Sequence, residues 1–181
     1  MARIVITGGP GAGKTAMLAA LHSRGHTIVG DTPRAIIQDR RRRGLSPRPD
    51  PESFAREWLR KDVDNFERHA ATPGRVFFER GVLDALCALE LVTPLSEGEL
   101  DVWISRYRYY PRIFVLPPWK AIYVNDAERD HTFEHAEWVD RLTREWYRRC
   151  GYEVCEVPMV SVEQRCDFVL QALASSEPDG S

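Results

Sequence analysis

Eight residues near the start of the chain have the types and the spacing of a loop that binds phosphate groups. The run that fits the pattern G-x-x-x-x-G-K-[ST] at every fixed position is Gly8, Gly9, Pro10, Gly11, Ala12, Gly13, Lys14 and Thr15. Glycines allow backbone N–H groups to surround a polyphosphate, because no Cβ atom stands in the way. We expect Lys14 to reach the β- and γ-phosphates of a nucleoside triphosphate, ATP or GTP, and the Thr15 hydroxyl to bind Mg²⁺.

The residues on either side of this run predict the elements that must hold it. The run 4–7 is short and apolar, as is typical of a buried strand, and Met17, Leu18 and Leu21 recur at helical spacing. Such a helix turns its N-terminal amides and the positive end of its dipole toward the phosphates. The order of strand, loop and helix favours a nucleotide-binding loop over the alternative, a glycine-rich turn without a ligand.

Four further strand-like runs alternate with helical patterns along the chain. The strand-like runs are residues 27–29, 75–78, 113–116 and 152–157, and the helical patterns cover about 32–43, 52–71, 82–92, 96–110, 131–150 and 161–174. Thr32 is expected to cap the first of these helices, with Pro33 in its first turn. The alternation predicts an α/β fold in three layers, with a parallel sheet covered by helices on both faces and ligands at the carboxyl ends of the strands.

Glu79 and Arg80 follow the third strand-like run, at the sheet edge where ligands are expected. A carboxylate at this place in a nucleotide-binding protein holds Mg²⁺ directly or through water, so Glu79 is a candidate metal ligand beside Thr15. Arg80 is expected to neutralise charge on a substrate or on a phosphoryl group in transfer. The alternative for both residues is an ion pair on the surface at the end of a strand.

Two more carboxylates stand close to strand ends. Asp31 ends the second strand-like run, and Arg34 stands one helical turn later. Asp31 is a candidate general base toward an acceptor hydroxyl, with Arg34 as a substrate contact, and the alternative is an acid that complements the dipole of the next helix. Asp84 lies in an otherwise apolar helical segment, where we expect it either to contact the substrate or to cap the helix.

Length and composition restrict the classes of protein. At 181 residues one domain is expected over 1–174, followed by a disordered tail at 175–181. The 25 basic and 27 acidic residues give a formal charge of −2, so no nucleic-acid partner is expected. No apolar run approaches the roughly 20 residues of a membrane span and no signal peptide is recognisable, which predicts a cytoplasmic protein. The four cysteines lack metal-binding spacing and are expected to be reduced, packed thiols.

Several short motifs follow one another in the order found in one family of nucleotide-binding domains. The motifs are the loop 8–15, Asp31-x-x-Arg34, Glu79-Arg80-Gly81-x-x-Asp84, Leu116-Pro117-Pro118 and Asn125-Asp126-Ala127-Glu128-Arg129. From residue 3 to about 174 the chain resembles the AAA-domain family of P-loop kinase-like NTPases that includes the nucleotide-binding kinase domain of NadR-type proteins. It is similar, more distantly, to deoxynucleoside and thymidylate kinases.

The resemblance implies a P-loop fold with the strand order 2-3-1-4-5. Residues 119–135 would form a lid over the phosphates, and Arg129 would be the lid arginine that binds nucleotide and stabilises the transferring phosphoryl group. The alternative for Arg129 is an exposed arginine at a helix start. Asp31 would match the base of nucleoside kinases. Relatives often have Asp where Glu79 stands and Glu where Asp31 stands. The acidic side chain at position 79 is therefore longer in this chain, and the one at position 31 is shorter.

The acceptor is expected between the helix after Asp31 and the helix that carries Trp58. Trp58 is a candidate for stacking on a ring, with Gln38 or Arg34 as hydrogen-bond donors, although its place on the apolar stripe of its helix favours the core. The arginines 40–43 are either a surface for an anionic partner or a solvated face near a helix C-terminus. Nucleosides, vitamin-like alcohols and antibiotic alcohols are the candidate acceptors.

Other functions find less support in the sequence. Residues 131–135 fit the zinc-protease pattern H-x-x-E-H, but no further ligand stands out, and we interpret His131 and His135 as polar residues at a helix start. None of the three lysines lies in the base-reading motif of a signalling GTPase. The chain is short for a motor ATPase with a helical lid domain. Two hypotheses remain, of which we favour the first: a Mg²⁺-dependent kinase for a small-molecule acceptor, and a nucleotide-dependent switch that regulates a partner.

Overall fold

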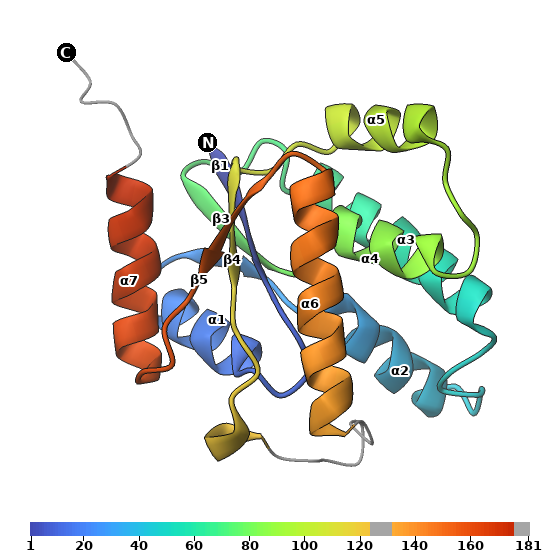
Figure 1. The fold of residues 1–181 in the computed structure, drawn as a ribbon, viewed down its shortest axis with the longest axis horizontal. Coiled ribbons are helices and arrows are strands. Elements are labelled where there is room, and N and C mark those ends of the chain that lie inside the picture. The colour runs from blue at the N-terminus through green and yellow to red at the C-terminus, as the bar shows by residue number, and fades with distance from the viewer. Residues whose placement is uncertain (124–131, 176–181) are drawn as a thin grey trace.

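Five short parallel strands form one sheet at the centre of the molecule (Figure 1). They are β1 (Ala2–Thr7), β2 (Thr27–Val29), β3 (Arg75–Glu79), β4 (Arg112–Val115) and β5 (Glu153–Glu156). In this computed structural model, which describes residues 1–123 and 132–175, the strand order is β2-β3-β1-β4-β5. This order confirms the 2-3-1-4-5 arrangement that the family resemblance implies, and it places β1 in the middle of the sheet.

Helices cover both faces of the sheet and complete three layers (Figure 1). One face carries α1 (Lys14–Ser23) and α7 (Val162–Ala174). The other carries α2 (Thr32–Arg42), α3 (Pro51–Arg68), α4 (Val82–Glu90), α5 (Glu97–Arg106) and α6 (Phe133–Arg149). A short 3-10 turn, η1 (Lys120–Ile122), follows β4. Among the helices in the described ranges, none has the length and apolar character needed to cross a membrane.

The side chains of each strand alternate between two apolar clusters. On β1, Ile4 and Ile6 pack with α1 and α7, whereas Val5 packs with the helices of the opposite layer, and all three side chains are fully buried. A sheet covered on both faces needs apolar residues at every position of a strand, because successive side chains point to opposite faces. The continuous apolar runs of the sequence follow from this arrangement.

Hydrogen-bonding side chains mark where helices begin, and one predicted cap is wrong. Ser96 and Ser161 start α5 and α7 with capping boxes, and both lie at the first position of the helical patterns 96–110 and 161–174. At α2 the cap is Asp31 and not Thr32, because the Asp31 carboxylate accepts a hydrogen bond from the backbone N–H of the third helical residue. Thr32 instead turns inward and donates its hydroxyl hydrogen to the buried carboxylate of Asp62.

The cysteines agree with the prediction of packed thiols. All four are free, with Cys87, Cys150 and Cys166 buried and Cys155 half-buried. Burial raises the pKa of both Cys87 and Cys150 to about 12, so these side chains stay uncharged near neutral pH.

Candidate functional site

The phosphate-binding loop, residues 8–15, joins the end of β1 to the start of α1, and neighbouring elements leave no room for side chains at its glycines, of which Gly8 and Gly13 are examples. Gly8 has a φ of 127°, and a Cβ atom there would overlap the carbonyl oxygen of Leu116. Gly13 has a φ of 87°, and a Cβ atom there would lie 2.8 Å from Nη1 of Arg165. Glycine at these positions therefore lets the backbone of the loop pass close to its neighbours, and a loop lined by backbone suits a polyphosphate.

Lys14 is the first residue of α1 and is only 3% exposed. Its ammonium donates hydrogen bonds to the carbonyl oxygens of Gly9, at 2.8 Å, and of Gly8, at 3.2 Å. The side chain thus lies back along the inside of the loop. A compact positive charge is held where the sequence predicts that phosphates bind.

Thr15 and Glu79 meet beside the loop. The Thr15 hydroxyl lies 3.0 and 3.1 Å from the two carboxylate oxygens of Glu79 and donates to them. Glu79 is the last residue of β3 and is 2% exposed, so it does not form the surface ion pair that was its alternative. Burial raises the pKa of its carboxyl group, and the Lys14 ammonium opposes that rise. The Thr15 hydroxyl and the Glu79 carboxylate are suitable ligands for a magnesium ion, because Mg²⁺ prefers oxygen ligands.

Arg80 directly follows β3 and has an unusual backbone conformation. Its φ of 68° lies in the left-handed region, which disfavours a residue with a Cβ atom by about 1–2 kcal/mol. The side chain is 12% exposed, and its Nη1 lies 3.6 Å from Oδ1 of Asp84. Strained backbone of this kind is concentrated at functional sites, where the surrounding structure holds it in place.

Asp84 is the centre of a buried hydrogen-bond network that holds Arg80. Its carboxylate accepts hydrogen bonds from the hydroxyl of Thr7 at 2.5 Å, the hydroxyl of Tyr147 at 2.6 Å and the N–H of Gly81 at 3.0 Å. The Gly81 bond makes Asp84 the capping acid of α4, which was one of its two predicted roles. Thr7 and Tyr147 carry no local sequence signal for these bonds, because they reach Asp84 from distant elements, β1 and α6.

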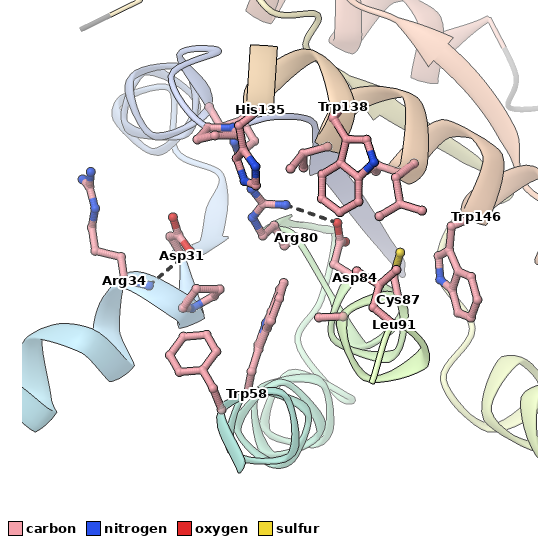
Figure 2. Close-up of a pocket in the computed structure, with 18 of the residues that line it drawn as sticks. Asp31, Arg34, Trp58, Arg80, Asp84, Cys87, Leu91, His135, Trp138 and Trp146 are labelled. Atoms are coloured by element: carbon pink, nitrogen blue, oxygen red, sulfur yellow. Dashed lines mark hydrogen bonds and ion pairs between the residues drawn. The ribbon is translucent and has the colours of Figure 1, made fainter. Parts of the chain in front are cut away.

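A pocket of about 270 Å³ opens beside the phosphate-binding loop, between α2, α3, α4 and α6 (Figure 2). Of the residues predicted to contact an acceptor, its lining includes Asp31, Arg34, Trp58, Arg80 and Asp84, but not Gln38. Pro10 and Lys14 of the loop line it as well. Five of the predicted acceptor residues and the loop lysine therefore border one cavity, which we call the acceptor-side pocket.

Trp58 belongs to both the core and the wall of the acceptor-side pocket. It is 8% exposed, and its indole N–H donates to Oδ2 of Asp62 at 2.7 Å. Asp62 also accepts the Thr32 hydroxyl, so one buried carboxylate joins α3 to the start of α2 next to Asp31. Asp62 was not identified from sequence. The signal that points to it is its place one helical turn after Trp58, where it can accept from the indole.

A second pocket, of about 530 Å³, lies on the other side of the loop and is lined by Lys14, Thr15, Trp119 and Arg165, among others. Arg165 is 3% exposed and donates to the carbonyl oxygens of Ala12, at 3.2 Å, and of Val160, at 2.9 Å. Its guanidinium lies 4.8 Å from the centroid of the Trp119 ring. Burial lowers its pKa. Arg165 thus joins the phosphate-binding loop to Val160 in the segment after β5, and we call this cavity the nucleotide-side pocket.

Some predicted residues lie outside the described residues or have other contacts. Arg129, the polar segment 125–130 and His131 are outside the described ranges. His135 lines the acceptor-side pocket, and no group of three or more metal-ligating side chains exists within the described ranges. Arg40 pairs with Glu57 at 3.1 Å, while Arg42 and Arg43 pair with Asp39 at 3.3 and 3.5 Å.

Solved structures with the same fold include small-molecule kinases. A deoxyadenosine kinase from M. mycoides with products bound aligns with a TM-score of 0.65 and 14% identity over 96% of this chain and 99% of that one. Shikimate kinases from Acinetobacter baumannii and Aquifex aeolicus both align with a TM-score of 0.59, with 12% and 16% identity over 98% of this chain and 95% and 99% of theirs. Identities this low establish a shared fold only.

Sequence comparison establishes the family. No curated protein matches the chain. A family model described as an AAA domain matches residues 3–165, which is most of the sequence. The phosphate-binding loop at the head of α1 and the 2-3-1-4-5 sheet agree with that match, and the chain belongs to this AAA-domain family of P-loop NTPases.

Proposed function

We propose that this chain is a kinase that uses Mg²⁺ and transfers the γ-phosphoryl group of ATP or GTP to the hydroxyl of a small-molecule acceptor. The observation that carries the proposal is that Lys14 lines both pockets. The nucleotide-side pocket, with Trp119 and Arg165, suits a nucleotide base, and the acceptor-side pocket contains Asp31 and Arg80. A phosphoryl group held at Lys14 would stand between a donor and an acceptor.

In the proposed transfer each residue acts on a different part of the reaction. The backbone of the loop 8–15 and Lys14 hold the β- and γ-phosphates. Asp31 accepts the proton of the acceptor hydroxyl while the oxygen of that hydroxyl bonds to the γ-phosphorus. The bond from the γ-phosphorus to the β,γ-bridging oxygen breaks at the same time, and the nucleoside diphosphate is released. Arg80, held by Asp84, balances negative charge on the group in transfer.

Thr15 and Glu79 are the proposed ligands of Mg²⁺, with Glu79 binding directly or through water. When bound, the ion neutralises charge on the β- and γ-phosphate oxygens. The contact of the Thr15 hydroxyl with both carboxylate oxygens of Glu79, at 3.0 and 3.1 Å, supports this assignment.

The finer assignments also belong to this proposal. We assign residues 1–174 to one kinase domain of the NadR type, and we keep residues 119–135 as the predicted lid, with Arg129 as its arginine. The described start of that segment contacts the loop, because a Cβ atom on Gly11 would lie 2.5 Å from the ring of Tyr123. Arg165 also lies over Trp119.

An acceptor screen tests the proposal. Nucleosides, vitamin-like alcohols and antibiotic alcohols would be added with Mg²⁺ and ATP or GTP, and release of ADP or GDP would be measured. We expect at least one acceptor to raise turnover above the basal rate. Lys14→Ala should abolish the increase, while Lys61→Ala should retain it, because Lys61 pairs with Glu57 and lines neither pocket.

The competing hypothesis, a nucleotide-dependent switch, makes a different prediction for the same screen. A switch hydrolyses its nucleotide slowly and gates a partner, so no small alcohol would change its turnover. Basal hydrolysis that depends on Lys14 and stays constant with every acceptor would contradict the kinase proposal.

A further inference from the structure

Asp31, the proposed base, lies at the start of α2 between two cavities. It lines the acceptor-side pocket and also a third cavity of about 700 Å³, which is bordered by the end of β2 and the second half of α3. A side chain that borders open space has fewer packing contacts to hold it in place. Hydrogen bonds at the start of α2 therefore carry more of the restraint on the position of Asp31.

Thr32, the residue after Asp31, is anchored to α3. Its side chain is 4% exposed, donates its hydroxyl hydrogen to Oδ1 of Asp62 and accepts a hydrogen bond from Nδ2 of Asn65 at 3.2 Å. Both partners belong to α3. Because a trans peptide unit is planar and fixes the distance between consecutive Cα atoms, an anchor at position 32 also restricts the backbone at position 31.

The second carboxylate oxygen of Asp62 holds a wall of the acceptor-side pocket. Oδ2 accepts a hydrogen bond from the indole N–H of Trp58 at 2.7 Å, one turn earlier on α3. The Trp58 ring lines the pocket, and Figure 2 shows it extending from α3 toward Arg80. One carboxylate thus connects the pocket wall to the start of α2, which carries Asp31.

Burial of a carboxyl group at position 62 is not explained by packing alone. The Asp62 side chain is 5% exposed, and an apolar side chain could fill space between two helices without the loss of hydration that a carboxyl group suffers. A carboxylate differs from such a side chain because its two oxygens accept hydrogen bonds from two donors at once. The contacts of Asp62 therefore indicate a role in placing Thr32 and Trp58 relative to each other.

We propose that Asp62 is a positioning residue, which holds Asp31 at the acceptor hydroxyl through Thr32 and holds the Trp58 wall beside it. The inference rests on the proposed kinase function, in which Asp31 is the base. Asp62 itself lines none of the three cavities, so it acts only through the residues that it holds. Such placement matters because a general base must lie within hydrogen-bond reach of the hydroxyl, and a small misplacement slows the reaction strongly.

Three variants test the effect on transfer. Asp62→Ala removes both hydrogen bonds, and Thr32→Val removes one of them with little change in volume. Asp62→Asn retains both, because its amide oxygen can accept from Trp58 and its amide N–H can donate to Thr32. With the acceptor from the screen at saturation, we expect kcat to fall at least about tenfold in Asp62→Ala and to stay within about threefold in Asp62→Asn.

The assay separates positioning from a loss of folded protein. Turnover is expressed per ATP-binding site, counted by calorimetry, because unfolded chains bind no nucleotide and drop out of the ratio. Asp64→Ala is the matched control on α3, since Asp64 forms an exposed pair with Arg60, and it should leave kcat unchanged. The double variant Thr32→Val/Asp62→Ala should be no slower than Asp62→Ala, because the second change removes a bond that is already absent.

Hydrogen exchange of backbone amides reports on the start of α2 without any acceptor. The N–H of Ala35 donates to the carbonyl oxygen of Asp31 at 3.1 Å, and the N–H of Arg165 forms the equivalent bond to Ser161 in α7 at 3.0 Å. Asp62→Ala and Thr32→Val should speed exchange at Ala35 by at least about tenfold and leave Arg165 unchanged. A general loss of stability would speed exchange at both amides.

The two measurements separate this inference from the kinase proposal. If exchange at Ala35 is faster but no acceptor is phosphorylated, Asp62 anchors the start of α2 as inferred and the kinase proposal fails. If an acceptor is phosphorylated and both Asp62→Ala and Thr32→Val retain the wild-type kcat, the inference is overturned while the kinase proposal stands. Should Asp62→Ala not fold, Thr32→Val decides: wild-type kcat with wild-type exchange at Ala35 overturns the inference.

Discussion

Replacing Asp62 by asparagine should stabilise the protein at pH 8 and leave its stability nearly unchanged at pH 4. Asp62 is 5% exposed, and burial raises the pKa of its carboxyl group to about 7. The nearby carboxylates of Asp84 and Asp31 raise it further, whereas hydrogen bonds from Thr32 and Trp58 act in the opposite direction. The folded protein therefore binds this proton more tightly than the unfolded chain does.

The sign and size of the effect follow from that difference in proton binding. The folded state is stabilised because it binds the Asp62 proton more tightly than the unfolded chain does. This contribution is fully present below the ordinary pKa of 3.8 and is lost as the pH rises through about 7. A pKa of about 7 against 3.8 corresponds to about 4 kcal/mol. Asparagine has the shape of the protonated acid and does not ionise; its amide oxygen can accept from the Trp58 indole, and its amide N–H can donate to the hydroxyl oxygen of Thr32. At pH 8 the free energy of unfolding of Asp62→Asn should exceed that of the wild type by about 4 kcal/mol, which corresponds to about 8–16 °C in Tm.

Urea unfolding of both proteins at pH 4, 6 and 8 measures this difference, and titrating groups common to both proteins cancel. Asp64→Asn is the matched control on the same helix, because Asp64 forms an exposed pair with Arg60 at 3.3 Å. Its effect should stay below about 1 kcal/mol at each pH. The reasoning would be refuted if the free energies of unfolding of the wild type and Asp62→Asn differed by the same amount at pH 4 and pH 8.

Three further predictions concern other parts of the site. Glu79→Gln should raise the Mg²⁺ concentration for half-maximal turnover by at least about tenfold, and an unchanged Mg²⁺ dependence would count against Glu79 as a metal ligand. Arg165→Ala should raise KM for the nucleotide by about tenfold, since its bonds to the Ala12 and Val160 carbonyls are lost, and an equal KM would contradict the assignment of the nucleotide-side pocket. Tyr147→Phe should lower the free energy of unfolding by about 1.5–3 kcal/mol, because the buried Asp84 carboxylate loses a donor, and urea unfolding with no measurable change would show that the bond is not needed.

Local patterns predicted the parts of this molecule that depend on neighbours in sequence. The phosphate-binding loop, the short strand 27–29 and the capping boxes at Ser96 and Ser161 each depend on a few consecutive residues. The alternation of strands and helices predicted the covered parallel sheet, and the strand order came from the family resemblance because no local pattern determines it.

Contacts between distant elements were not predictable from such patterns. The bond from Thr7 to Asp84 joins residues 77 positions apart, and the bond from Tyr147 to Asp84 joins residues 63 positions apart. In the sequence, nothing distinguishes Asp62 from the other charged residues of α3. It becomes buried only because α2 packs against α3. The backbone of Arg80 likewise has a φ of 68°, a conformation that the residue type does not favour.

The variant Asp31→Asn tests the kinase proposal most directly, because the proposal predicts that it impairs phosphoryl transfer and not nucleotide binding. Asparagine caps a helix as well as aspartate does, so α2 should keep its start while the proposed base is lost. With the best acceptor from the screen, we predict that the affinity for ATP or GTP stays within about threefold and that phosphoryl transfer falls by at least about 100-fold. Transfer at the wild-type rate would contradict the account, because Asp31 would then act only as the cap of α2.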